Sequence, residues 1–246
     1  SGLVGSEMCI RDSFCSMLRA DMGADVIKIE KPNGGDDTRR MGPPFIDNES
    51  AAFLAMNRNK RSMVLNFKEP AGVEAMKKLV KDADIVIENY RTGVMERLGL
   101  GYEDMKAINP GIIYCSVSGF GRTGPYAKRG GYDLIAQGMS GIMSFTGVPG
   151  TAPVKAGVPI ADMNAGMFSV YGILTAYINK LKTGNGQYLE ISLLEAALAY
   201  TVWESAGYFA TGEVAGGPAH GASERIAEQP AEEQHVAADD DPAHNG

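Results

Sequence analysis

Asp162 is the carboxylate with the most unusual surroundings in this sequence. It follows the apolar run 157–161 (GVPIA) and precedes the almost uncharged stretch 163–179, which has the composition of a buried helix. A carboxylate at a helix start either caps the helix by accepting backbone N–H groups or acts as a nucleophile that the helix dipole keeps ionised. These two roles are compatible. Cys115 is a second candidate nucleophile, but residues 14–216 contain no histidine to activate it, so we expect it in the core.

Basic residues gather in three stretches that the sequence pattern places in loops. Residues 14–216 are neutral overall, and clusters of this kind on a neutral body suit a phosphorylated ligand. Ordinary solvated surface charge is the alternative at each position. The three clusters are Arg39 and Arg40; Arg58, Lys60, Arg61 and Lys68; and Lys128 and Arg129.

The last of these clusters belongs to a glycine-rich stretch, 119–131 (GFGRTGPYAKRGG). Its first three residues resemble the start of a dinucleotide-binding fingerprint. Pro125 follows the third glycine and no clear helix opens there, so the complete fingerprint for a nicotinamide cofactor fails. For Tyr132 and Asp133, which come next, the simplest interpretation is an aromatic side chain packed at a helix start with an aspartate as cap.

Strands alternate with helices along residues 14–208, which predicts an α/β fold: a Rossmann-like parallel sheet with flanking helices. We expect Trp203, Met163 and Met167 to pack in its core. The expected strands are 25–30, 62–67, 83–88, 112–118 and 187–192. The expected helices are 14–22, 69–80, 94–98, 102–108, 132–143, 162–182 and 193–208.

Composition excludes several classes of protein. The 246 residues are 44% apolar, which is enough for a core, while a net charge of −7 argues against binding nucleic acid by bulk electrostatics. No run of 18 apolar residues predicts a membrane span. Three cysteines are too few for a disulfide scaffold, so we expect a cytoplasmic protein. No His, Cys and Asp cluster has the spacing of a metal site, so we expect no metal.

Both ends of the sequence differ from the middle. Residues 1–13 resemble a translated sequencing adapter, show no strand or helix period, and are expected to be non-native and to stay outside the core. Residues 213–246 are rich in acidic residues and contain all three histidines of the chain. Such a segment cannot bury enough apolar surface to fold, so we expect an acidic disordered tail or a frameshifted segment. A metal-binding tail is the alternative interpretation of its histidines.

The middle resembles the class III coenzyme-A transferases, the group of formyl-CoA, carnitine-CoA and succinyl-CoA transferases, with an acyl-CoA racemase as a branch. The similarity covers residues 14 to about 212, a little over half of a typical member. It is carried by ADMGADVIKIEKPNGGDDTRR, MNRNKRSMVLNFK, DADIVIENYRTGVMERLGLGYE, INPGIIYCSVSGFGRTGPYAKRGGYDLIAQGMSGIMSFTG, VPIADMNAGM and TGNGQYLEISLLEAAL.

The resemblance implies a reaction and a set of site residues. CoA would pass from an acyl-CoA thioester to a carboxylic acid through an aspartyl anhydride and an aspartyl-CoA thioester on Asp162. CoA would be a substrate, and no cofactor would be tightly bound. The implied CoA contacts are Arg39, Leu65, Lys68, Asn89, Tyr90, Arg97, Arg129, Gly130, Gly131 and Tyr132.

The same resemblance leaves alternatives open. The racemase branch has a histidine where this sequence has Tyr132, and a racemase needs an acid and a base on opposite sides of the reacting carbon, which favours transfer. Family members form interlocked homodimers. We expect the family's first strand and small domain to be missing from residues 14–212, so an inactive fragment that only binds CoA is the other alternative.

Overall fold

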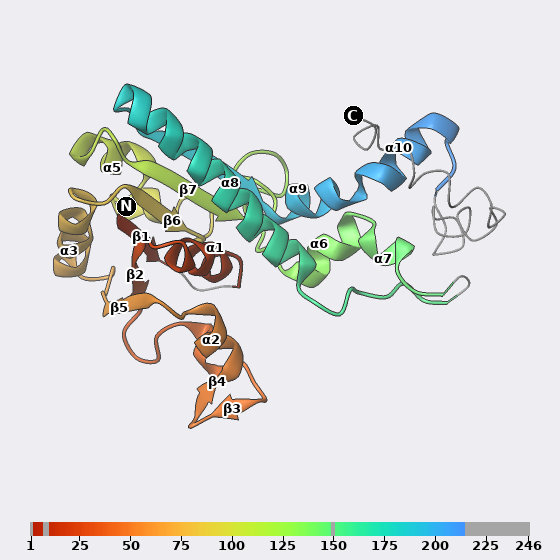
Figure 1. Ribbon diagram of the computed structural model, residues 1–246, viewed down its shortest axis with the longest axis horizontal. Coiled ribbons are helices and arrows are strands. Elements are labelled where there is room, and N and C mark those ends of the chain that lie inside the picture. The colour runs from red at the N-terminus through yellow and green to blue at the C-terminus, as the bar shows by residue number, and fades with distance from the viewer. Residues whose placement is uncertain (1, 7–9, 149–150, 215–246) are drawn as a thin grey trace, which may run out of the picture.

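A six-stranded sheet, all of whose strands are parallel, forms the centre of the computed structural model, which describes residues 2–6, 10–148 and 151–214 (Figure 1). Its order is β5-β2-β1-β6-β7-β8. The strands are β1 (Gly2–Ser6), β2 (Asp25–Glu30), β5 (Lys60–Val64), β6 (Ile85–Glu88), β7 (Ile113–Ser118) and β8 (Gln187–Ser192). This is the strand order of dinucleotide-binding folds, and the predicted Rossmann-like α/β class is confirmed.

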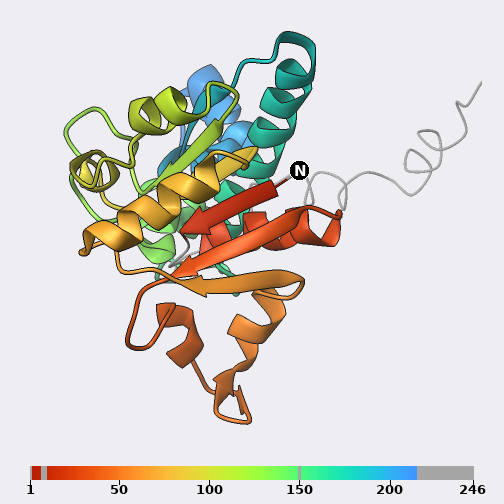
Figure 2. The same cartoon turned by 90° about the vertical axis from the view of Figure 1, so that its left-hand side faces the viewer.

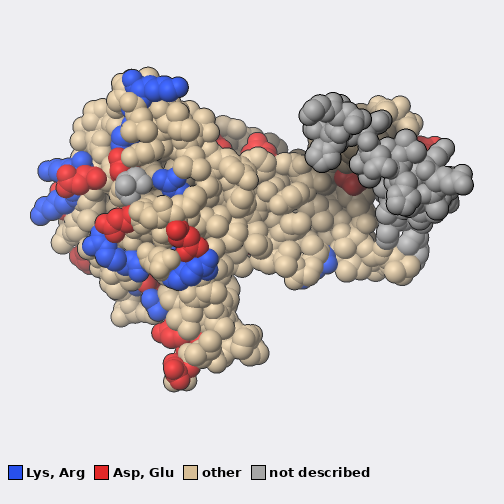
Figure 3. Space-filling model, in the orientation of Figure 1, with Lys and Arg blue, Asp and Glu red and all other residues tan. Residues whose placement is uncertain are grey.

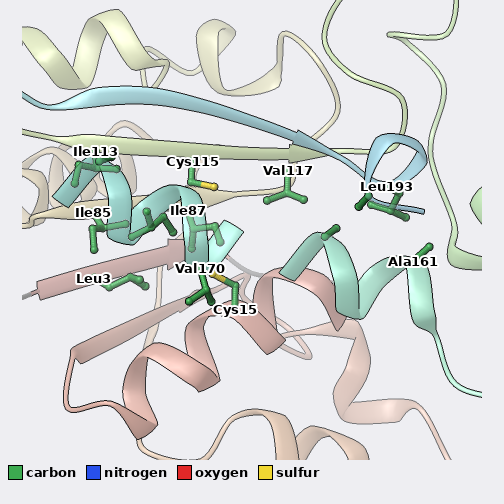
Figure 4. Packing of buried hydrophobic residues seen from close by; sticks show 14 of the residues in the cluster. Leu3, Cys15, Ile85, Ile87, Ile113, Cys115, Val117, Ala161, Val170 and Leu193 are labelled. Carbon is green, nitrogen blue, oxygen red and sulfur yellow. The ribbon is translucent and has the colours of Figure 1, made fainter. Parts of the chain in front are cut away.

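The central strands β6 and β7 are buried on both faces and are largely apolar, whereas the edge strand β5 is mostly exposed. On one face, Leu3, Ile85, Ile113 and Cys115 pack against the long helix α8 (Ile160–Thr183) and its neighbours (Figure 4). The helices that share this core are α1 (Ile10–Asp21), α6 (Asp133–Met139), α7 (Ile142–Phe145) and α9 (Leu193–Leu198). Cys115 is therefore a core residue, as the sequence predicts, and burial raises the pKa of its thiol to about 12.

The alternate residues of the same strands, such as Val4, Val86 and Tyr114, point to the opposite face. There they pack under three further helices, and Met76 and Met105 are fully buried among them. These helices are α3 (Pro70–Val80), α4 (Val94–Arg97) and α5 (Tyr102–Ile108).

The prediction that residues 1–13 stay outside the core is wrong for the part of them that is described. β1 lies between β2 and β6 and pairs in parallel with both (Figure 2). Leu3 is fully buried and Val4 almost so. Five residues are too few to show the alternation of apolar and polar residues that marks a strand. The conformation of this segment is decided instead by β2 and β6, which offer backbone hydrogen-bond partners on both sides of it.

Several predicted helices have different bounds. α1 begins at Ile10, inside the string expected to be unstructured. The helix expected over 132–143 is broken into α6 and α7 at Gly141, whose φ of 87° ends a right-handed helix. The helix expected over 193–208 is divided into α9, a 3₁₀ turn at Ala199–Thr201 and α10 (Val202–Thr211). On α10, Trp203 is 70% exposed, so its predicted core position is wrong.

An arm beyond β5 was not predicted (Figure 1). It consists of a 3₁₀ turn (Asp37–Arg40), the short strands β3 (Phe45–Ile46) and β4 (Glu49–Ser50), and α2 (Ala51–Met56). These elements have two to six residues each and are too short to show a period. The segment 215–246, expected to be disordered and considered as a metal-binding tail, lies outside the described residues.

Candidate active site

Asp162 is the third residue of α8 and lies near the helix N-terminus. Its side chain is 11% exposed, and one carboxylate oxygen, Oδ1, lies 3.4 Å from Nη1 of Arg11 on α1. Burial raises the pKa of this carboxyl to about 6. The positive charge of Arg11 opposes that rise, and the nearby carboxylate of Asp133 adds to it. Asp162 is thus a desolvated carboxylate that ionises close to neutral pH.

Asp162 does not cap its own helix, because the residue before the first turn of α8 is Pro159, which offers no side-chain acceptor. The cap comes from another helix. Oδ1 of Asp133, the first residue of α6, accepts the backbone N–H groups of Ala161 at 2.9 Å and Asp162 at 3.3 Å. The predicted cap at Asp133 therefore exists, but it holds the start of α8, and the carboxylate of Asp162 is not used to cap that helix.

Gln137 extends this arrangement and was missed in the sequence. It is fully buried on α6, and its Nε2 donates to Oδ2 of Asp133 at 2.6 Å. Its Oε1 accepts the backbone N–H of Ala156 at 2.8 Å, within the segment that leads into α8. The signal was available: a glutamine four residues after an aspartate lies on the same face of a helix.

The glycine-rich loop after β7 folds back on its own start. A Cβ atom added to Gly119 would lie 2.5 Å from Cα of Gly131, so only glycines permit this close approach. The loop returns the chain to Tyr132 and Asp133, directly before α6. Tyr132 is 72% exposed, so its predicted packing is wrong.

The residues expected to contact CoA follow the carboxyl ends of four strands, which lie in two adjacent pairs on either side of β1. Arg39 follows β2, Leu65 and Lys68 follow β5, Asn89 and Tyr90 follow β6 with Arg97 on α4, and residues 129–132 follow β7. In an open parallel sheet these ends form one edge, which is where ligands bind. Nδ2 of Asn89 is buried and has no hydrogen-bond partner among the described residues.

Residues 7–240 match the family model described as CoA-transferase family III. The chain belongs to CoA-transferase family III. It is 47% identical over 205 residues to the succinate–glutarate CoA-transferase of Agrobacterium fabrum, a match that covers 81% of this chain and 51% of that protein. It is 44% identical over 195 residues to the mouse succinyl-CoA:glutarate CoA-transferase, with 79% of this chain and 45% of that protein covered.

A solved CAIB/BAIF family protein from Brucella suis has the same fold. It superposes with a TM-score of 0.85 at 43% identity, over 87% of this chain and 58% of that one. This family III chain therefore spans about half the length of the curated relatives it matches.

In this family III chain, Arg39 is already paired. Its guanidinium forms two 2.8 Å hydrogen bonds with the carboxylate of Glu30 and lies 4.0 Å from the ring centre of Phe53. Arg39 thereby holds the pKa of Glu30 down to about 2, with help from Ser62 and the backbone of Asp36. Because Glu30 occupies most of its donors, the guanidinium of Arg39 can offer a ligand a fixed planar face but few free hydrogen-bond donors.

Two negative observations apply to the part of the chain that the structure describes. Within it, no three His, Cys, Asp or Glu side chains are placed to share a metal ion. Within the same residues, no helix has the length and apolar character needed to cross a membrane.

Proposed function

We propose that this chain supplies the CoA-binding region and the nucleophile of an enzyme that moves CoA from an acyl-CoA thioester to a carboxylic acid. Asp162 carries the proposal, because it combines a desolvated carboxylate with a backbone that Asp133 holds in place. The proposal also uses the ten contacts expected from family resemblance, from Arg39 to Tyr132, as the CoA-binding set.

In the proposed reaction the carboxylate of Asp162 attacks the thioester carbonyl carbon, and the C–S bond breaks to release the CoA thiolate. The resulting mixed anhydride is attacked by the thiolate at the aspartyl carbonyl, which releases the donor acid and leaves an aspartyl-CoA thioester. The acceptor carboxylate then attacks that thioester, giving a second anhydride and free thiolate. The thiolate attacks the acceptor carbonyl, which forms the new acyl-CoA and restores Asp162.

Short dicarboxylic acids are the proposed substrates, because the relatives named above act on succinate and glutarate according to their names. A relative at 41% identity is named an acetyl-CoA:oxalate CoA-transferase, which is a further short dicarboxylate. Racemisation is disfavoured, because Tyr132 is exposed and is a phenol where that branch has a histidine base.

A homodimer in the cytoplasm completes the proposal. Exposed apolar side chains on α10, Trp203 and Phe209 among them, support a covered surface in the complete protein. Figure 3 shows that charged side chains gather over the sheet, α1 and the arm, while the face along α6 and α7 is sparsely charged.

The test uses both this chain and the complete protein that contains it, each incubated with succinyl-CoA and glutarate. Transfer is followed as glutaryl-CoA by mass spectrometry, and the covalent intermediate as CoA or acyl mass added to the peptide that contains Asp162. Transfer by the complete protein with an adduct on Asp162 supports the proposal. An adduct on another residue contradicts the mechanism. CoA binding without transfer in the complete protein supports the binding-only alternative instead.

A further inference from the structure

Arg122 lies in the loop after β7 and makes contacts with three other elements. Its Nε donates to Oγ of Ser116 in β7 at 2.6 Å, and its Nη1 donates to Oε1 of Glu96 on α4 at 2.9 Å. Its Nη2 donates to the carboxylate of Glu88 at the end of β6. The side chain of Arg122 is only 11% exposed, although it belongs to a surface loop.

The backbone of Arg122 is fixed as well, since its N–H donates to the carboxylate of Glu190 in β8. One residue therefore ties together β6, β7, β8 and α4. A guanidinium suits this task because its donors are fixed in one plane and point in several directions at once.

Glu88 is the buried centre of the arrangement. Its side chain is completely buried, and its second oxygen accepts the backbone N–H of Tyr90 at 2.8 Å. Burial raises the pKa of Glu88, while Arg122 and the hydrogen bonds from Ser116 and Tyr90 act against that rise. A buried carboxylate contributes to the fold only while such partners remain, so loss of Arg122 would leave an uncompensated group.

The two residues hold the two loops expected to contact CoA. Glu88 directly precedes Asn89 and Tyr90 and fixes the backbone of Tyr90. Arg122 anchors the start of the loop whose end is formed by residues 129–132. A second link joins the same two loops, because Oγ1 of Thr92 donates to the carbonyl oxygen of Ala127 at 2.8 Å.

We propose that Glu88 and Arg122 are positioning residues that set the distance between the β6 and β7 loops and thereby shape the CoA-binding edge of the sheet. The inference rests on the proposed function, since it concerns the loops that would contact CoA. Neither residue contacts CoA itself; each acts through the backbone of its loop. The Arg122 side chain is largely buried and pairs with the buried Glu88 and Ser116 as well as the exposed Glu96, whereas Arg129 of the same loop is exposed.

The test compares three variants in the complete protein: Arg122→Gln, Arg122→Lys and, as a matched control for loss of one positive charge, Lys77→Gln. Lys77 forms an exposed pair with Glu74 on α3, away from both loops. We expect Arg122→Gln to weaken CoA binding in calorimetry by about tenfold or more, because displaced loops no longer present their contacts together. With saturating acyl-CoA, the amount of adduct on Asp162 should stay at the wild-type level.

Arg122→Lys keeps a positive charge beside Glu88. Its single ammonium group cannot replace the three guanidinium nitrogens that donate to Ser116, Glu96 and Glu88. We expect Arg122→Lys to fold, with a melting temperature near that of the wild type. Its affinity for CoA should lie between those of the wild type and Arg122→Gln. This variant therefore tests the inference even if Arg122→Gln does not fold. Wild-type affinity in folded Arg122→Lys, or an equal loss in Lys77→Gln, overturns the inference alone. Absence of CoA binding in the wild type overturns the proposed function and this inference with it.

Discussion

Two buried carboxylates at the same edge of the sheet have opposite properties. Counted over the whole residue, Glu30 at the end of β2 is 3% exposed and Asp162 at the start of α8 is 8% exposed. Each has an arginine beside it. Yet the pKa of Glu30 is lowered to about 2, whereas the pKa of Asp162 is raised to about 6.

Hydrogen bonding accounts for the difference. Glu30 accepts two bonds of 2.8 Å from Arg39, one of 2.6 Å from Ser62 and one of 2.9 Å from the backbone of Asp36. These donors favour the charged form more strongly than burial opposes it. The contact of Asp162 with Arg11 is 3.4 Å long and does not offset the cost of burial. Burial beside an arginine is therefore not enough to tell whether a carboxylate has a lowered or a raised pKa.

The largest effect expected from this comparison concerns catalysis. Asp162→Ala, and nearly as fully Asp162→Asn, should reduce transfer by the complete protein more than about a thousandfold, because an amide or methyl group cannot form the anhydride. CoA affinity should change little. The control is Glu103→Gln, an exposed acidic residue in the first turn of α5. Substantial transfer by Asp162→Ala in a steady-state assay would refute the proposed mechanism.

Leu3→Ala tests the contribution of β1 to the fold that positions both carboxylates, Glu30 and Asp162. β1 lies directly beside β2, which ends at Glu30, and precedes α1, which provides Arg11. Leu3 is fully buried, so its truncation should lower the free energy of unfolding by about 3 kcal/mol. Urea denaturation measures this, with Leu181→Ala on exposed α8 surface as the control. An unchanged midpoint would show that residues 2–6 do not occupy the sheet centre.

Glu30→Gln should destabilise the fold next most strongly. The amide cannot accept both guanidinium bonds, and Arg39 keeps only its longer, 3.4 Å contact with the carboxylate of Glu49. We expect this to cost about 2 kcal/mol, because the arginine is partly exposed. Arg61→Gln, which breaks the exposed pair with Asp25, is the matched control and should cost less than about 0.5 kcal/mol. Equal midpoints for the two variants in urea would mean that the Glu30 network is not structural.

The sequence predicted much of this arrangement, for reasons that residues make clear. β7 was found because both of its faces are covered, which leaves a largely apolar run. β2 was found because apolar and polar residues alternate in it before Pro32, and β8 because it follows the turn at 183–186. Asp162 was found because a charge between an apolar run and an apolar helix is rare. β1 was missed because its conformation depends on β2 and β6, which are distant in sequence.

The capping of α8 by Asp133 and the inward turn of Arg122 could not be predicted for the same physical reason. Each depends on contacts across 28 or more residues of sequence: Asp133 with Ala161, and Arg122 with Glu88. Local patterns give a carboxylate near a helix start and a basic residue in a loop. Which helix is capped, and which carboxylate is paired, are decided by packing.

Arg11→Gln should sharpen the contrast between the two carboxylates. The positive charge of Arg11 lowers the pKa of Asp162, so its removal should raise that pKa above about 6, while Glu30 keeps its own partners. The pH dependence of adduct formation at limiting acyl-CoA reports this group and should move to higher pH. A profile that does not move, or moves to lower pH, would show that Arg11 does not act on Asp162.

The smallest effect is a difference in how stability depends on pH. The folded-state pKa of Glu30 is below its ordinary value of 4.5, so its contribution is complete above pH 4.5 and is lost as pH falls toward 2. The folded-state pKa of Asp162 is above its ordinary value of 3.8, so its carboxylate costs stability as pH rises from 3.8 through 6.

The free energy of unfolding of Asp162→Asn should therefore exceed that of the wild type by about 1–2 kcal/mol at pH 8 and by almost nothing at pH 4. Glu30→Gln should show its full loss at pH 8 and a smaller one near pH 3. Urea denaturation of both variants at pH 3, 4, 6 and 8 measures the two trends against each other. Parallel curves would mean that the two carboxylates are solvated alike, and the assignment of Asp162 as the desolvated, reactive one would then fail.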